Sequence, residues 1–157
     1  MLLAKFIQKR QNASVWHIDA TGSVVRAVTE KPIYYYVVVM TINDREIPAL
    51  PLYEFLTDSH NVGNLTMAFV AWWGHMQAIG VLPKTIVLDM SWALIHSSLF
   101  AFCSENIDDH LKKLWRYLEN PNCEMNGPCL RLCASHFIQA VSCRLAKIGV
   151  NKQVSQR

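Results

Sequence analysis

Two hydrophobic runs that each end on an aspartate constrain the fold more than any other feature of this sequence. The first covers residues 15–18 and is followed by Asp19; the second, Thr85–Leu88, is followed by Asp89. Runs of this kind are typical of buried strands in a parallel or mixed sheet. Because α/β folds place ligands at the carboxyl ends of such strands, two carboxylates there can converge on a divalent metal ion. The alternative is that each aspartate caps a helix or begins a turn.

The composition is that of one globular domain. The 157 residues are enough to bury a core, and 52% hydrophobic with 17% charged residues excludes disorder as the main state. A net charge of +3 permits nucleic-acid binding without indicating it. The five cysteines are an odd number and no secretory leader is recognisable, so we expect thiols in a reducing, intracellular environment. No apolar stretch approaches the roughly 20 residues that span a bilayer, so no membrane partner is expected.

The period of the hydrophobic pattern changes along the chain from that of strands to that of helices. Pro48 and Pro51 restrict the strand that contains them to a sheet edge or to an irregular strand end. Either Asn61 or Asn64 is a candidate cap for the first long helix, and Gly80 ends it. The expected strands cover residues 15–20, 24–28, 32–42, 47–52, 85–89 and 130–132, and the expected helices cover 61–79, 91–102, 107–118 and 135–148. Apart from the strand candidate at 24–28, the order is β-β-β-α-β-α-α-β-α, which predicts a single α/β domain that opens with an antiparallel meander.

Five short segments carry a family resemblance: residues 17–22 (HIDATG), 34–36 (YYY), 54–60 (EFLTDSH), 88–94 (LDMSWAL) and 132–137 (LCASHF). Together they resemble the catalytic domain of eukaryotic cut-and-paste DDE transposases, above all Mutator-like element transposases and the transposon-derived animal proteins related to them. The resemblance implies a ribonuclease H-like α/β fold, with a mixed sheet of an antiparallel three-strand meander plus parallel strands, flanked by helices. It implies a partial core over residues 14–148, incomplete at the C-terminus, after a remnant helix (1–13) and before a tail (149–157).

The resemblance also implies a reaction and a site. Asp19 matches the first catalytic acid and Asp89 the second, and the pair would hold Mg²⁺ or Mn²⁺. Cys133 and His136 match the family's Cys-x-x-His motif. The ancestral activity would be metal-dependent cleavage of DNA phosphodiesters and strand transfer, with transposon ends as the DNA partner. A nuclear location and a homo-oligomer fit that activity.

The sequence departs from the family pattern at the third acid. That acid should follow the Cys-x-x-His motif, but no Asp or Glu occurs after His136. We therefore expect a transposase-like fragment that is inactive alone, unless Glu105 or Asp109 supplies the missing ligand. One alternative is a domesticated remnant that binds DNA or protein without a metal.

A second alternative is a zinc-stabilised interaction module. Its ligands would be the donors Cys123, Cys129, Cys133 and His136. Their spacing fits no common zinc finger, so unligated thiols are favoured and zinc is not expected at these residues.

Two further patterns have both a functional and a structural interpretation. The Trp72–Trp73 pair could stack on bases, but tryptophans on an apolar helical face favour a place in the core. The basic residues could trace a phosphate-binding surface, but they are spread over several elements and favour ordinary solvated positions. These are Lys9, Arg10, Lys112, Lys113, Arg116, Arg131 and Arg144.

Overall fold

The computed structural model describes residues 15–22, 31–41, 49–120 and 127–148. Its strands are β1 (Val15–Gly22), β2 (Tyr34–Thr41), β3 (Ala49–Thr57), β4 (Thr85–Leu88) and β5 (Cys129–Leu132). Its helices are α2 (Val62–Ala78), α3 (Trp92–Ser98), α4 (Ile107–Glu119) and α5 (Ala134–Ile148), and a π-helical turn (Leu99–Cys103) follows α3. This is the predicted order of elements.

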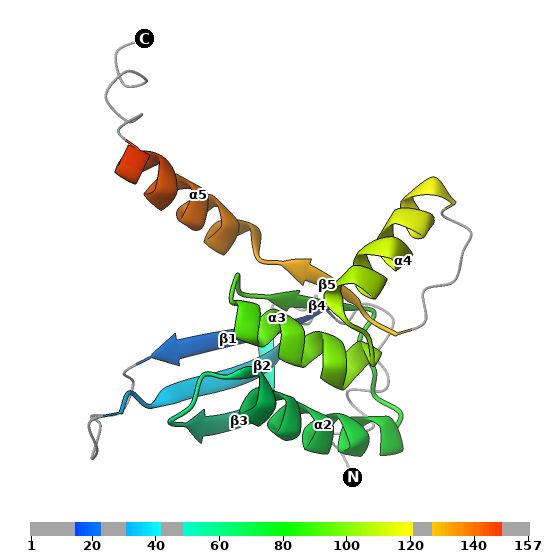
Figure 1. Cartoon of the computed structure of the whole chain (residues 1–157). Helices are drawn as coiled ribbons and strands as arrows, with labels where there is room; N and C mark the ends of the chain where they lie inside the picture. The colour runs from blue at the N-terminus through cyan, green and yellow to red at the C-terminus, as the bar shows by residue number, and fades with distance from the viewer. Residues whose placement is uncertain (1–14, 23–30, 42–48, 121–126, 149–157) are drawn as a thin grey trace.

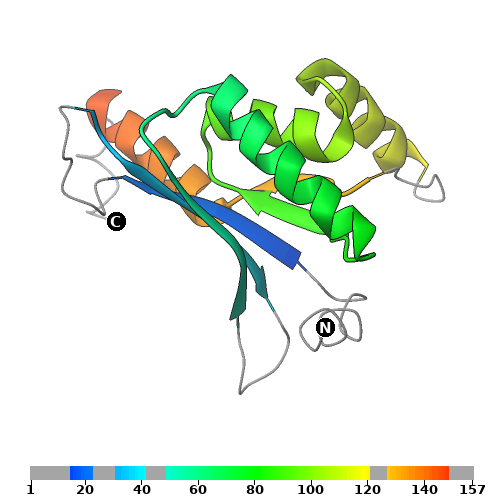
Figure 2. The ribbon, with the colours of Figure 1, turned by 90° about the horizontal axis from the view of Figure 1, so that it is seen from below.

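The five strands form one mixed sheet in the order β3-β2-β1-β4-β5. β1 pairs antiparallel with β2, and β2 with β3, whereas β1–β4 and β4–β5 are parallel. The predicted α/β fold with an antiparallel meander beside parallel strands is therefore confirmed. Helices α2 and α3 lie against the same face of this sheet, and α4 and α5 extend from its β5 side (Figures 1 and 2).

The core lies between the sheet and α2. Strand residues alternate between buried and half-buried positions, so one face of the sheet is covered more completely than the other. Trp72 and Trp73 are each 7% exposed, and their rings lie 5.2 and 6.1 Å from that of Trp16 on β1. The prediction that this tryptophan pair belongs to the core is confirmed.

Strand β3 differs from its predicted bounds. It begins at Ala49 and continues to Thr57, whereas residues 47–52 were expected. The extension occurs because Tyr53 and Phe55 pack against the core cluster. β3 is an edge strand, as Pro51 favours, and Pro51 lies at the irregularity where the register of β3 with β2 shifts.

The helix predicted over residues 91–102 is also different, since α3 gives way to the π-helical turn at Leu99. Trp92 occupies the first position of α3 and is 69% exposed, and among the described aromatic groups it contacts only the ring of His96. Helix α2 follows the prediction: the Asn61 side chain accepts a hydrogen bond from Asn64 N–H at 2.9 Å, and Gly80 takes a left-handed φ of 69°.

Several predictions lie outside the described residues. These are the strand at 24–28, the turn at 43–46, the helix at 1–13 and the tail at 149–157. No described helix is both long and apolar enough to cross a membrane.

Candidate functional site

The two aspartates lie next to each other on neighbouring strands. Asp89 directly follows the last residue of β4, whereas Asp19 lies within β1, which continues to Gly22 instead of ending near the aspartate as the sequence indicated. β1 and β4 run parallel with Ile18 opposite Leu88, so Asp19 and Asp89 each occupy the next position toward the same edge of the sheet. Local backbone groups orient both carboxylates. Ala20 N–H donates to Asp19 Oδ1 at 2.8 Å, and Met90 N–H donates to Asp89 Oδ1 at 2.5 Å.

The Cys-x-x-His segment reaches the same edge from β5. Cys133 N–H donates to Leu88 O at 2.7 Å, which ties the end of β5 to the end of β4. Helix α5 begins at Ala134, so His136 lies in its first turn. One ligand atom from each of Asp19, Asp89 and His136 lies within 4.8 Å of the others. The two acids therefore lie close together, and His136 lies beside them.

His136 makes an unusual contact with Asp89. Its Nδ1 lies 3.1 Å from Asp89 Oδ1, yet this nitrogen is shielded from solvent and has no aligned hydrogen-bond partner. The side chains of His136 and Asp89 are 38% and 30% exposed, so the cluster as a whole is open to solvent. Since buried polar atoms are almost always satisfied, a shielded nitrogen beside two carboxylates fits a place for a cation.

The chemistry of the three donor groups indicates which metal ions this site could bind. Carboxylate oxygens suit Mg²⁺ and Mn²⁺, whereas imidazole nitrogen suits transition metals. Asp19, Asp89 and His136 therefore fit a divalent cation, and Mn²⁺ satisfies both kinds of donor better than Mg²⁺.

A network of hydrogen bonds between side chains stabilises the turn that follows Asp89. His60 Nε2 lies 2.8 Å from Ser91 Oγ, and His60 Nδ1 is hydrogen-bonded to the Tyr36 hydroxyl. Burial raises the pKa of Tyr36 to about 12, so this hydroxyl stays protonated. Ser91 caps α3 by accepting from Leu94 N–H at 3.4 Å, and its own N–H donates to Asp89 O at 2.9 Å.

Sequence reasoning missed this function for His60. The residue appeared only as part of a family-like segment, and its partners are 24 and 31 positions away. Tyr36 and His60 fix the backbone beside a candidate ligand without touching the candidate ion.

The described residues of the zinc alternative, Cys129, Cys133 and His136, are not gathered in one place. Cys129 begins β5 opposite Thr85, and Cys133 follows the other end of that extended strand. Four residues of strand span about 13 Å. Within the described residues, no cluster of three metal ligands contains Cys129 or Cys133. Cys123 lies outside the described part of the chain.

Neither acid named as a substitute third ligand reaches the site, so that hypothesis is wrong. Glu105 pairs with Lys113 and His110, at 2.6 and 3.0 Å. Asp109 accepts from the Asn106 side chain at 2.7 Å in the first turn of α4. This region contacts the segment that enters β5, because Cys103 Sγ lies 3.6 Å from Pro128 O, whereas the candidate site lies where β4 and β5 end.

In comparisons with known proteins, no protein-family model matches the chain, and no curated protein sequence matches it.

Proposed function

We propose that this chain is a transposon-derived, DDE transposase-like core with a ribonuclease H-like fold. Its ancestral reaction is metal-dependent cleavage of DNA phosphodiesters and strand transfer at transposon ends, in the nucleus. The observation that carries the proposal is the convergence of Asp19, on β1, with Asp89, just after the neighbouring parallel strand β4. The sheet order supports it, because a meander that carries the first acid and a parallel strand that precedes the second are what the resemblance implied.

Asp19 and Asp89 would hold the divalent ion, and His136 would offer a third donor. Such an ion, when bound, activates a water molecule and stabilises the leaving 3′-oxygen. The chain itself orients the carboxylates through the N–H groups of Ala20 and Met90. An open site at a sheet edge suits a wide substrate such as duplex DNA better than a small molecule, which would need a deep cleft.

The same geometry accounts for the expected lack of cleavage by this chain. Its third donor is an imidazole, which is neutral when it binds a metal, where the family has a carboxylate. The site therefore offers two negative charges, and a two-metal clamp on the attacking and leaving oxygens needs more. We propose that one ion binds and that catalysis of DNA cleavage is lost.

Metal binding is the first test. Calorimetric titration with Mn²⁺ should show one site in the wild-type chain and none in Asp19→Asn. Asp58→Asn is the matched control, because Asp58 is 58% exposed and lies 3.8 Å from Lys31, outside the cluster. Equal Mn²⁺ affinity in wild type and Asp19→Asn would overturn the site.

Plasmid nicking in Mg²⁺ or Mn²⁺ is the second test. We expect none from the wild-type chain. Nicking that both Asp19→Asn and Asp89→Asn abolish would show that His136 suffices as the third donor. A DNA-binding assay distinguishes this proposal from the alternative of a domesticated remnant that binds DNA. That alternative predicts DNA binding that needs no metal and is retained in both Asp19→Asn and Asp89→Asn.

A further inference from the structure

A second cluster of metal-ligand side chains lies at the base of α4, away from the aspartate site. One ligand atom from each of Cys103, Glu105 and His110 lies within 4.8 Å of the others. The three come from eight consecutive residues, in a Cys-x-Glu-x₄-His spacing. They meet because Ser104 takes a left-handed φ of 55° and reverses the chain, and Asn106 then caps α4 by accepting from Asp109 N–H at 2.9 Å.

The imidazole of His110 is buried beside the other two donors. The residue is 5% exposed, and its Nδ1 lies 3.0 Å from Glu105 Oε2. Because Nδ1 is the ring nitrogen that lies against Glu105, it is the donor that an ion shared with this carboxylate would take.

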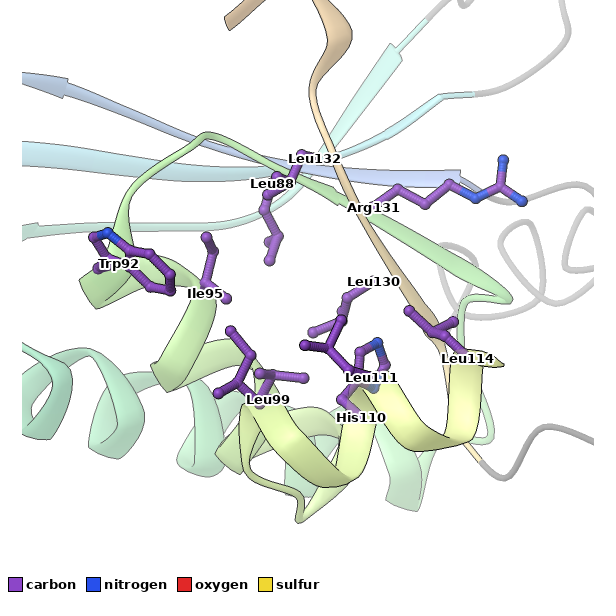
Figure 3. Close-up of a pocket in the computed structure, with 11 residues that line it drawn as sticks. Leu88, Trp92, Ile95, Leu99, His110, Leu111, Leu114, Leu130, Arg131 and Leu132 are labelled. Carbon is purple, nitrogen blue, oxygen red and sulfur yellow. The ribbon is translucent and has the colours of Figure 1, made fainter. Parts of the chain in front are cut away.

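The ring of His110 also borders an apolar pocket. Leucine side chains from several elements lie around the ring, as Figure 3 shows, and together they line a pocket of about 220 Å³. Apart from His110, none of the lining side chains is a metal ligand, so the pocket does not compete with Cys103 and Glu105 for an ion.

The negative charge of Glu105 is already balanced by the ammonium group of Lys113. Lys113 Nζ lies 2.6 Å from Glu105 Oε1, and both side chains are less than 20% exposed. A metal ion at this point would take over the counter-charge that Lys113 supplies. Burial raises the pKa of the Cys103 thiol to about 11, against the opposing charge of Lys113, so the metal-free thiol is protonated.

We propose that Cys103, Glu105 and His110 bind one Zn²⁺ ion as a structural clamp at the base of α4. Sulfur, imidazole nitrogen and carboxylate oxygen are the donors that zinc takes in proteins, with water completing a tetrahedron. On binding, the Cys103 thiol releases its proton to solvent and a sulfur–zinc bond forms. The separations around such an ion are roughly 3.5 Å, which small side-chain rotations reach from those observed.

The clamp would act on a helix that needs support. α4 extends from the β5 side of the sheet rather than lying across it (Figure 1). Cys103 ends the π-helical turn and Glu105 precedes α4, so a shared ion would lock the start of α4 to that turn. The inference is independent of the proposed transposase function and involves none of its residues.

Cobalt provides the probe. Co²⁺ replaces Zn²⁺ in such sites and gives a sulfur-to-metal charge-transfer band in the near ultraviolet only when a thiolate is bound. The aspartate site has no sulfur ligand and is silent. We expect the band in wild-type protein freed of any polyhistidine tag, its loss in Cys103→Ser, and more than about 100-fold weaker Co²⁺ binding in His110→Gln. Cys143→Ser is the matched control, since Cys143 is exposed on α5, and it should keep the band.

Lys113→Gln keeps the proposal falsifiable if the other variants fold poorly. Removing the competing ammonium should tighten Co²⁺ binding by about tenfold, because a like charge no longer opposes the ion. Absence of the band in both wild type and Lys113→Gln would overturn the proposal, as would a band that survives Cys103→Ser. If Lys113→Gln bound Co²⁺ with unchanged or lower affinity, the idea that the metal ion replaces the Lys113 ammonium beside Glu105 would be wrong.

Discussion

The two clusters of ligand side chains differ in how their negative charge is balanced. Asp19 and Asp89 lie in an open site, and within the described residues no lysine or arginine comes within ion-pair distance of either. At the base of α4 the opposite holds, since Glu105 is partly buried and contacts both Lys113 and His110. At the first site the negative charge of the two carboxylates is available to a cation. At the second site a metal ion would have to replace the Lys113 ammonium that already pairs with Glu105.

This difference predicts different metals and different consequences. An open pair of carboxylates keeps its waters and binds hard cations weakly and reversibly. A buried site with a thiol binds a softer ion, and the protein fold gains the binding free energy. Loss of the first site should change chemistry alone, and loss of the second should change stability.

The largest expected effect is that a substitution at either site impairs metal binding at that site and leaves the other site unchanged. Asp89→Asn should lower Mn²⁺ affinity by more than about 100-fold, since a direct ligand is lost, and should leave the Co²⁺ charge-transfer band intact. Cys103→Ser should do the reverse. Calorimetry and absorption spectroscopy on the same two proteins measure both quantities. If either variant impaired both sites, the two clusters would not be independent.

The next effect is on stability. Glu105→Gln should lower the free energy of unfolding of the metal-free protein by about 2 kcal/mol, because the Lys113 ammonium loses its charged partner in a partly buried place. Urea unfolding followed by tryptophan fluorescence measures this. Glu119→Gln is the control: its carboxylate accepts from Trp115 Nε1 at 2.8 Å on the surface, so little change is expected. Equal effects of the two substitutions would mean that the Glu105 network contributes nothing particular.

A smaller effect should distinguish two ions at the open site. His136→Ala should weaken Mn²⁺ binding by about tenfold and change Mg²⁺ binding little, because Mg²⁺ prefers oxygen ligands and retains water in place of imidazole. Parallel titrations with the two ions test this. Equal losses for both would show that His136 acts by orienting Asp89, which it contacts at 3.1 Å, rather than as a ligand.

The open site could be predicted from the sequence because its geometry follows from two strands. Each aspartate ends an apolar run, and parallel neighbours carry such ends to one edge, so local patterns placed both residues. The same argument placed His136, one turn past β5. It failed for Tyr36 and His60, whose contacts join elements far apart in the sequence, and no periodic pattern reports such contacts.

The cluster at the base of α4 escaped prediction for a different reason. Its residues are close in sequence, but their spacing matches no regular metal motif. They converge through a left-handed Ser104 and a π-helical turn, and the sequence marks neither, since the left-handed position favours glycine and no proline signals the change. The limits of β3 were missed similarly, because prolines 48 and 51 indicated an ending where tertiary packing of Tyr53 extends the strand.

The smallest expected effect is in the pH dependence of stability. Burial acts to raise the pKa of Glu105, but hydrogen bonds from Lys113 and His110, together with their charges, outweigh it and lower the pKa below the ordinary value of 4.5. An acid with a lowered folded-state pKa stabilises the fold above the unfolded-state pKa, and this contribution disappears as the pH falls through the folded-state value. Wild-type protein should therefore lose its advantage over Glu105→Gln as the pH decreases from about 5 through the acid range. Urea midpoints of the two proteins, taken at steps of pH, measure the difference. A difference that stays constant to the lowest pH at which both remain folded would mean that the carboxylate charge of Glu105 does not support the base of α4.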